Sequence, residues 1–233
     1  MSELTYHRRR GEIETYFDRT AVDAWKRLTS DAPVGRIRAT VRAGRNTMRE
    51  TLLGWLPADL TGARLLDAGC GTGALAVEAA RRGAEVVAID LSPTLIDLAR
   101  ERAAQQPGGA RIDFRSGDML DPALGQFDHV VGMDSLIHYR AADAVRVLAG
   151  LALRTRRSIL FTFAPRTPAL TVMHAVGRLF PRGDRAPAIE PVAADALVRL
   201  FDAEPALQDW RPSRTLRVAS GFYTSQALEL VRR

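Results

Sequence analysis

Alternate glycines mark the segment with the clearest chemical meaning. Residues 67–73 read DAGCGTG, with Gly69, Gly71 and Gly73 directly after an apolar run. Glycine lets the backbone turn tightly and approach a ligand without a side chain in between. A helix that begins after such a loop offers free N–H groups to an anionic group. We therefore predict a ligand-binding loop between a strand and a helix.

The glycine spacing and the preceding acid indicate which ligand this loop binds. A dinucleotide fingerprint requires Gly-x-Gly-x-x-Gly, and here the third glycine comes one residue early. The carboxylate of Asp67, before the first glycine, would repel a pyrophosphate but accepts hydrogen bonds from a cationic amino group. The methionine end of S-adenosylmethionine carries such a group. The loop therefore predicts a site for this methyl donor, which leaves as S-adenosylhomocysteine.

Two further acids fit the same ligand. Asp90 ends an apolar run about 20 residues after the loop, where such an acid binds ribose hydroxyls. Asp118 follows the next predicted strand and could accept the adenine amino group. Either acid alone could be a solvated loop residue, but ligands of parallel sheets bind where such strands end, so we expect both in the donor site. Three neighbouring residues complete the predicted set: Leu91, Met119 and Met133.

A histidine follows the fourth predicted strand, where it would face the transferred methyl group. His138 lies in the segment 133–139, which reads MDSLIHY. A single histidine is often only structural, but this position favours the active site, as a base or as a donor that orients the substrate. We predict His138 as the catalytic residue.

The elements that must position these residues alternate between strands and helices from Arg64 onward. Such alternation predicts a mostly parallel sheet with helices on both faces. Strands are predicted at Arg64–Asp67, Glu85–Asp90, Arg111–Arg115, His129–Met133, Ser158–Phe163, Arg214–Ala219 and Phe222–Val231. Helices are predicted at Ala74–Arg82, Pro93–Gln106, Ala141–Leu153 and Ala193–Phe201, with Ser92 as a cap and Pro93 at the first helical position.

The last two strands meet at Gly221 and would add an antiparallel C-terminal edge strand to the sheet. A tail of this kind is similar to that of methyltransferases and unlike that of nicotinamide dehydrogenases. The expected fold is therefore α/β, a Rossmann-like class I methyltransferase fold with a mostly parallel seven-stranded sheet.

Two segments do not fit the alternation. Residues 1–60 have apolar residues at helical spacing, with a second amphipathic run at Val41–Leu56. They predict an N-terminal helical arm or cap before the methyltransferase core at 61–233. Residues 164–191 contain five prolines and an apolar stripe on one helical face, and we expect a substrate-covering insertion there. The alternative is that both segments simply pack on the sheet.

Composition limits the class of protein. The chain has 233 residues, a net charge of +6 and one cysteine, so neither a disulfide framework nor a protein-bound metal is indicated. No segment has the roughly 20 apolar residues of a membrane-spanning helix, and the polar N-terminus is not a signal peptide, so we expect a cytoplasmic location. No basic run interleaved with aromatic residues indicates nucleic acid. The excess of arginine reflects either codon usage or attraction to an anionic substrate.

Five segments, read together, point to one family. They are 16–20 (YFDRT), 67–73 (DAGCGTG), 133–139 (MDSLIHY), 162–167 (TFAPRT) and 177–181 (GRLFP). The chain resembles the magnesium-protoporphyrin IX O-methyltransferases of bacteriochlorophyll synthesis. The resemblance runs from about Tyr16 to the last residue, and all segments but the glycine loop are specific to that family.

This resemblance implies methyl transfer to one propionate of magnesium-protoporphyrin IX, giving the monomethyl ester. It also implies cooperation with the large, porphyrin-binding subunit of magnesium chelatase. Because the substrate is apolar, we further expect loose peripheral contact with the photosynthetic membrane. A propionate has a pKa of about 4.3 and is already ionised at neutral pH, so His138 is expected to orient it rather than deprotonate it.

A flat apolar porphyrin with carboxylates needs an apolar cover and cationic partners. Predicted substrate-binding residues are Tyr16, Trp25, Thr29, Arg166, Met173 and Phe180, with Arg42, Arg45 and Arg178 as further carboxylate partners. Chlorophyll-forming relatives carry tyrosine where Thr29 stands, so a phenolic role does not carry over to that position. His174 either approaches the magnesium of the substrate or is a surface residue.

Two alternatives stay open. A methyltransferase of another small molecule, such as a quinone precursor, would share the donor site but need a firmer general base, because a phenol is neutral at pH 7. A catalytically silent, donor-binding regulator of the chelatase is the second. The presence of Asp67, Asp90 and His138 favours an enzyme over the regulator.

Overall fold

The computed structural model describes residues 3–20, 35–166 and 189–233. Its centre is a seven-stranded sheet with the strand order β3-β2-β1-β4-β5-β7-β6. The strands are β1 Arg64–Ala68, β2 Glu85–Asp90, β3 Ile112–Ser116, β4 Phe127–Gly132, β5 Thr155–Phe163, β6 Trp210–Ser220 and β7 Tyr223–Arg232. Among the described residues, no helix is long and apolar enough to span a bilayer.

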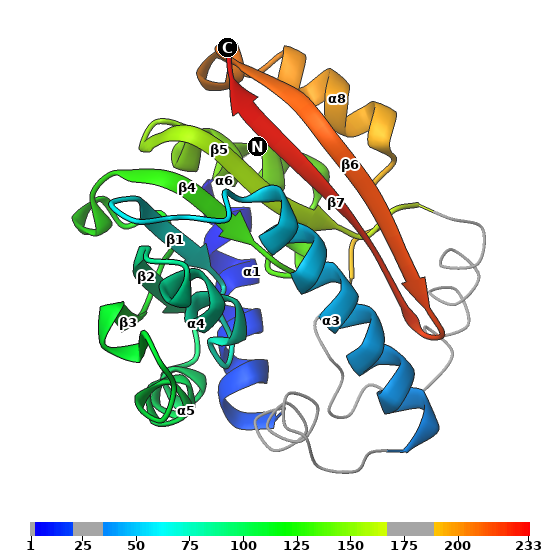
Figure 1. Ribbon diagram of the computed structural model, residues 1–233. Helices are drawn as coiled ribbons and strands as arrows, with labels where there is room; N and C mark the ends of the chain where they lie inside the picture. Colours follow the sequence, from blue (N-terminus) through cyan, green and yellow to red (C-terminus); the bar gives the residue numbers. More distant parts are fainter. Residues whose placement is uncertain (1–2, 21–34, 167–188) are drawn as a thin grey trace.

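The first five strands are parallel and the last pair closes one side of the sheet (Figure 1). β1 pairs in parallel with both β2 and β4, so the chain reverses its direction of winding at β1. β7 is antiparallel to β5 and to β6. The expected α/β class is therefore confirmed, with the antiparallel C-terminal strand placed one position inside the edge strand β6.

β6 begins four residues earlier than the predicted Arg214, and a proline explains the difference. Pro212 has no N–H to donate, a feature that indicates the end of a strand when only the sequence is read. Here Pro212 pairs with Leu230 in an edge strand, and the register shifts between Pro212 and Thr215. An edge strand tolerates proline because one of its sides has no hydrogen-bonding neighbour.

Helices cover both faces of the sheet (Figure 1). One apolar cluster joins the sheet to α3 Arg36–Trp55, α4 Ala74–Arg81 and α5 Pro93–Ala104. The other joins it to α6 Ala141–Ala152 and α8 Ala194–Asp202. α5 begins as expected, because the Ser92 side chain accepts a 3.2 Å hydrogen bond from the Leu95 N–H and Pro93 follows it.

The N-terminal arm divides into two parts with different surroundings. α3 belongs to the core, since its residues Met48 and Leu52 are fully buried against the sheet. α1, Glu3–Thr15, and the π-helical turn Tyr16–Thr20 contact the turns that follow the parallel strands. The predicted arm is thus a core helix preceded by a segment that lies over the carboxyl ends of the strands.

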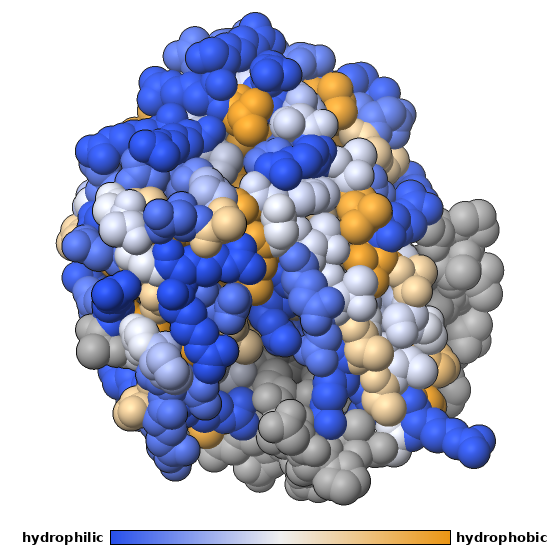
Figure 2. Space-filling model, in the orientation of Figure 1, coloured by the Kyte–Doolittle hydropathy of each residue, from blue (hydrophilic) through white to orange (hydrophobic). Residues whose placement is uncertain are grey.

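The face of the molecule seen in Figure 2 is mostly hydrophilic, and its hydrophobic side chains are scattered rather than gathered. Two of the exposed apolar residues, Ile37 and Phe222, are 58% and 61% exposed. Ile37 is in the first turn of α3 and Phe222 at the β6–β7 turn. These two elements touch, because a side chain on Gly221 would overlap Thr40.

Candidate active site

The glycine loop forms the tight turn that its sequence predicts. Gly69, Gly71 and Gly73 have φ angles of 88°, 54° and 77°, in the left-handed region that favours glycine. The Gly69 N–H donates to the Ile89 carbonyl oxygen at 2.8 Å, which fixes the loop to the end of β2. A side chain on Gly69 would overlap the Cβ of Ser135, so this glycine also permits close contact with the turn after β4.

Asp67 is a buried carboxyl group with one oxygen left for a ligand. Its residue is 2% exposed, and Oδ2 has no hydrogen-bond partner in the described part of the chain. Burial, and secondarily the nearby Asp90, raise the pKa of Asp67 to about 7, although a hydrogen bond from the Ala76 N–H acts in the opposite direction. A bound ammonium group would offset both the burial of the carboxylate and its repulsion from Asp90. The site therefore fits the amino group of S-adenosylmethionine.

Asp90 at the end of β2 holds the loop from the other side. Its Oδ2 accepts a 2.8 Å hydrogen bond from the Gly71 N–H, and Oδ1 accepts a 3.0 Å bond from the Ser92 N–H. Burial raises the pKa of Asp90, while these backbone donors lower it. Each oxygen retains acceptor capacity, so the predicted contact with ribose hydroxyls stays open to it.

The predicted adenine contact, Asp118, is bound by the N-terminal helix. Its Oδ1 accepts hydrogen bonds from Tyr6 Oη at 2.7 Å and the Leu120 N–H at 2.9 Å, and its Oδ2 accepts one from Arg10 Nη1 at 2.6 Å. Burial opposes ionisation of Asp118, but the donors Leu120, Tyr6 and Arg10 prevail and lower its pKa. Adenine recognition by Asp118 stays a prediction, and α1 occupies much of its acceptor capacity.

The three apolar residues predicted for the donor site all lie at strand ends. Met119 is buried and Leu91 partly buried in the cluster that faces α6, while Met133 packs against the cluster that faces α4. Their side chains therefore contribute to apolar walls next to Asp90, Asp118 and the end of β4.

His138 lies in the short 3₁₀ turn Leu136–His138 after β4 and is 7% exposed. Phe17 contacts its ring edge to face, with ring centres 5.9 Å apart. Arg9 Nε donates a 2.8 Å hydrogen bond to the His138 carbonyl oxygen. The N-terminal segment therefore covers the predicted catalytic residue and excludes water from one side of it.

The turn between β4 and His138 contains Asp134, a residue for which the sequence predicts no role. Asp134 is the one non-glycine residue in the described chain with a positive φ, 55°. Its side chain is 6% exposed and forms an ion pair of 2.5 Å with Arg45 of α3. Tyr223 Oη donates to it at 3.1 Å and Ser225 Oγ at 3.2 Å. Its partners are 28 to 91 residues away, so no local sequence signal could have revealed them.

The predicted substrate residues divide between described and undescribed parts of the chain. Tyr16 is partly buried beside Phe17, and Arg166 is exposed just after β5. Arg45, a predicted partner of a substrate carboxylate, is paired with Asp134 of the protein itself. Six predicted residues lie outside the described ranges: Trp25, Thr29, Met173, His174, Arg178 and Phe180.

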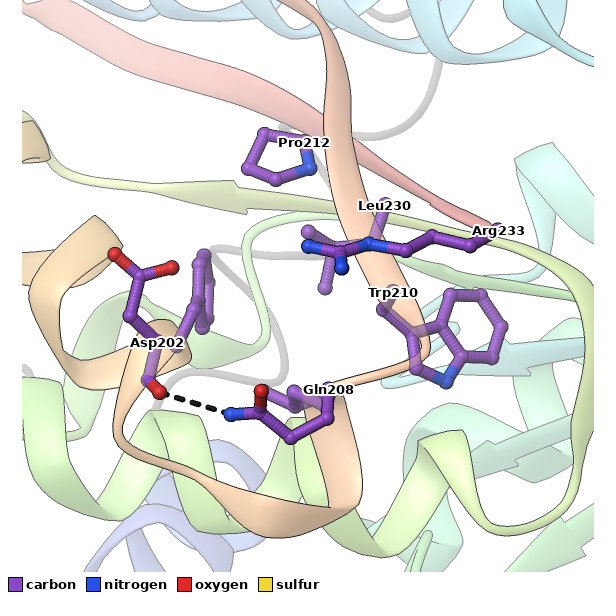
Figure 3. Close-up of a pocket in the computed structure, with 8 residues that line it drawn as sticks. Asp202, Gln208, Trp210, Pro212, Leu230 and Arg233 are labelled. Atoms are coloured by element: carbon purple, nitrogen blue, oxygen red, sulfur yellow. Dashed lines mark hydrogen bonds between the residues drawn. The ribbon is translucent and has the colours of Figure 1, made fainter.

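A hollow at the other end of the sheet does not belong to this site. It has a volume of about 130 Å³ and lies between α8 and the start of β6, where Gln208 Nε2 donates a 2.8 Å hydrogen bond to the Asp202 carbonyl oxygen (Figure 3). Small-molecule sites have volumes of about 300–1,000 Å³, so a porphyrin would not fit. Within the described ranges, no group of three His, Cys, Asp or Glu side chains is placed to hold a metal.

Comparisons with known proteins identify the family of this chain. Residues 65–157 match the family model "Methyltransferase domain", and residues 132–232 match "Magnesium-protoporphyrin IX methyltransferase C-terminus". The magnesium-protoporphyrin O-methyltransferase of Rhodobacter capsulatus is 52% identical over 94% of this chain and 95% of its own length. That of Synechocystis sp. is 32% identical over 94% of this chain and 95% of its own length.

A solved structure has the same fold over nearly the whole chain. It is the magnesium protoporphyrin IX methyltransferase (ChlM) from Synechocystis PCC 6803 with bound SAH, with a TM-score of 0.83 and 28% identity. The likeness covers 96% of this chain and 99% of that one. With the donor loop, the buried Asp67 and His138 arranged as described, the chain belongs to the magnesium-protoporphyrin O-methyltransferases, a family of S-adenosylmethionine-dependent enzymes with the class I methyltransferase fold.

Proposed function

We propose that this protein transfers the methyl group of S-adenosylmethionine to one propionate carboxylate of magnesium-protoporphyrin IX, giving the monomethyl ester. The single observation that carries the proposal is the close approach of two turns. The turn that bears His138 contacts the donor loop where Ser135 meets Gly69. β1 and β4 are neighbouring strands, which supports a donor and a catalytic residue at adjacent strand ends.

The chemistry requires alignment more than acid–base catalysis. When bound, S-adenosylmethionine supplies a methyl group on a positively charged sulfur. The propionate is ionised at neutral pH, with a pKa of about 4.3, so one of its oxygens can form the new bond to the methyl carbon. The carbon–sulfur bond breaks in line with it, its electron pair stays on sulfur, and no proton is transferred. Correct orientation can supply roughly 7–11 kcal/mol of such a barrier.

In this scheme His138 donates a hydrogen bond that orients the propionate. Its buried position under Phe17 suits this task, because loss of the water shell strengthens electrostatic contacts with the carboxylate. His138 does not need to act as a base, because the propionate is already ionised.

We assign the cover over the porphyrin to the N-terminal segment and to the insertion at 164–191. The two ends of the insertion pair with each other, and one of them contacts the turn that bears His138. The Arg166 N–H donates to the Val192 carbonyl oxygen at 2.9 Å, and the Glu190 N–H donates to Ile137 at 2.8 Å. Arg9 of α1 forms a 2.8 Å ion pair with Glu190, so the two predicted covers meet above the turn that bears His138.

The chemistry of the substrate suggests a partner and a location for this enzyme. We propose that the large, porphyrin-binding subunit of magnesium chelatase delivers the porphyrin, because a flat apolar ligand is better handed over than released into water. We also propose a cytoplasmic location, and the apolar substrate supports loose peripheral contact with the photosynthetic membrane.

The decisive experiment incubates the purified protein with methyl-labelled S-adenosylmethionine and magnesium-protoporphyrin IX. We expect a labelled porphyrin that loses its label in alkali, as an ester does. Label transfer to a quinone precursor but not to the porphyrin would establish the first alternative. Tight donor binding without turnover on either acceptor would establish the chelatase regulator.

A further inference from the structure

A second orphaned polar atom lies beside the donor loop. Ser135 Oγ is buried and has no hydrogen-bond partner within the described part of the chain, as is also true of Asp67 Oδ2. The Cβ of Ser135 is against Gly69, and its Oγ lies 3.1 Å from the position that a Cβ on Gly132 would take. Buried polar side-chain atoms are rarely left without a partner. One such atom two residues before Gly69 and another on the residue that contacts Gly69 indicate a polar ligand between β1 and β4.

The backbone places Ser135 there through an unusual conformation of the preceding residue. Asp134 takes a left-handed φ of 55°, which aspartate tolerates better than most residues but which still costs energy. Thr162 Oγ1 compensates by accepting the Asp134 N–H at 2.7 Å and donating back to Oδ1 at 3.1 Å. Arg45, Tyr223 and Ser225 hold the same carboxylate. Elements α3, β5 and β7 thus converge on one turn.

We propose that Ser135 Oγ binds the carboxylate at the amino-acid end of the methyl donor, and that Asp134 is the positioning residue that holds it there. Asp67 can only accept hydrogen bonds when ionised, so it takes the ammonium group. The Ser135 hydroxyl has a proton to donate and takes the neighbouring carboxylate. The proposal deepens the donor site of the proposed function by naming a partner for each charge of the amino acid.

The test compares two ligands that differ only in this end of the molecule. S-adenosylhomocysteine carries the amino acid, whereas 5′-methylthioadenosine has the same adenosine and sulfur without it. Calorimetry should show that Ser135→Ala lowers the affinity for S-adenosylhomocysteine about tenfold or more, as expected for a lost hydrogen bond to a charged group. Its affinity for 5′-methylthioadenosine should change less than about twofold. Ser213→Ala, an exposed serine of β6, should change neither.

Unchanged S-adenosylhomocysteine binding by Ser135→Ala would overturn the proposal, and so would equal weakening of both ligands, because that would indicate a distorted glycine loop. Neither measurement needs the porphyrin, so the result does not depend on the methyl acceptor.

A double-mutant cycle tests the positioning role of Asp134. Asp134→Asn keeps the shape of the side chain and should lower the affinity for S-adenosylhomocysteine in the wild-type background. In the Ser135→Ala background it should cause little further loss, because the two residues then act through one hydrogen bond. Additive losses would show that Asp134 merely stabilises the fold, and the melting temperature of each variant provides the matching structural readout.

Discussion

Tyr6 donates a 2.7 Å hydrogen bond to Asp118, which lies 112 residues further along the chain. Burial is the main cause of a raised pKa for Tyr6, so its hydroxyl stays protonated and remains a donor. Arg10, one turn later on α1, binds the other oxygen of the same carboxylate. The first helix of the chain is therefore tied directly to the predicted adenine side of the donor site.

The contacts of Tyr6 and Arg10 with Asp118 should control how fast the donor binds and leaves. We expect Tyr6→Phe combined with Arg10→Gln to accelerate both binding and release of S-adenosylhomocysteine by about threefold to tenfold, measured by stopped-flow fluorescence. The range is modest because Arg10 is 32% exposed, and exposed ion pairs contribute only about 0–1 kcal/mol. Arg8→Gln, on the exposed side of the same helix, is the matched control. Unaltered rates in the double variant would show that α1 does not gate the site.

The raised pKa of Asp67 predicts how donor affinity depends on pH. Its carboxyl group must be ionised to bind an ammonium group, and its pKa is about 7 against an ordinary value of 3.8. Affinity for S-adenosylhomocysteine should therefore rise between pH 6 and pH 7.5, below the range near 8 where an α-amino group loses its proton. Asp67→Asn should bind more weakly and show no such rise. A wild-type affinity that is flat over this interval would contradict the assignment.

The same shift predicts the stability of the ligand-free protein. A raised pKa means that the folded state binds the proton more tightly than the unfolded state. This contribution is complete below about pH 4 and is lost as the pH rises through about 7. In urea unfolding without ligand, Asp67→Asn should therefore gain stability relative to the wild type as the pH increases from 5 to 8. A constant difference between the two proteins would show that Asp67 ionises normally.

His138 should affect turnover without affecting donor binding. We expect His138→Ala to lower kcat for porphyrin methylation by about tenfold to a hundredfold, as for a misplaced substrate, while S-adenosylhomocysteine affinity changes less than about twofold. Initial rates with saturating donor give the first quantity and calorimetry the second. His7→Ala, an exposed histidine on α1, should retain activity. If both turnover and porphyrin affinity of the His138 variant equalled those of the wild type, its assignment as the orienting residue would be wrong.

Alanine variants at Gly69 and Gly62 allow the effect of backbone strain to be measured apart from the effect of steric overlap. Gly69 and Gly62 have positive φ angles of 88° and 76°, but a side chain would overlap Ser135 at Gly69 and meet nothing at Gly62. Gly62→Ala should therefore cost only the roughly 1–2 kcal/mol of a left-handed alanine, measured by urea unfolding, and leave donor binding intact. Gly69→Ala should in addition reduce donor affinity more than tenfold. Equal behaviour of the two variants would show that the contact between loop and turn is dispensable.

Patterns that depend on nearby residues were readable from the sequence. The alternation of strands and helices predicted the α/β sheet, Ser92 and Pro93 predicted the start of α5, and the glycine spacing predicted the donor loop. Helix capping, turn geometry and strand periodicity depend on residues that are close in sequence, so they can be predicted from short segments. The family could likewise be recognised from short segments.

Contacts between distant residues were decided only by the tertiary structure. No local pattern distinguishes Tyr6 and Arg10 from surface residues, yet both bind Asp118, which is far from α1 in the sequence. Asp134 and Ser135 had no predicted role, because their neighbours come from α3, β5, β7 and the glycine loop. The sequence alone determined which donor the loop would hold, and the packing of these separate elements decided which other side chains surround it.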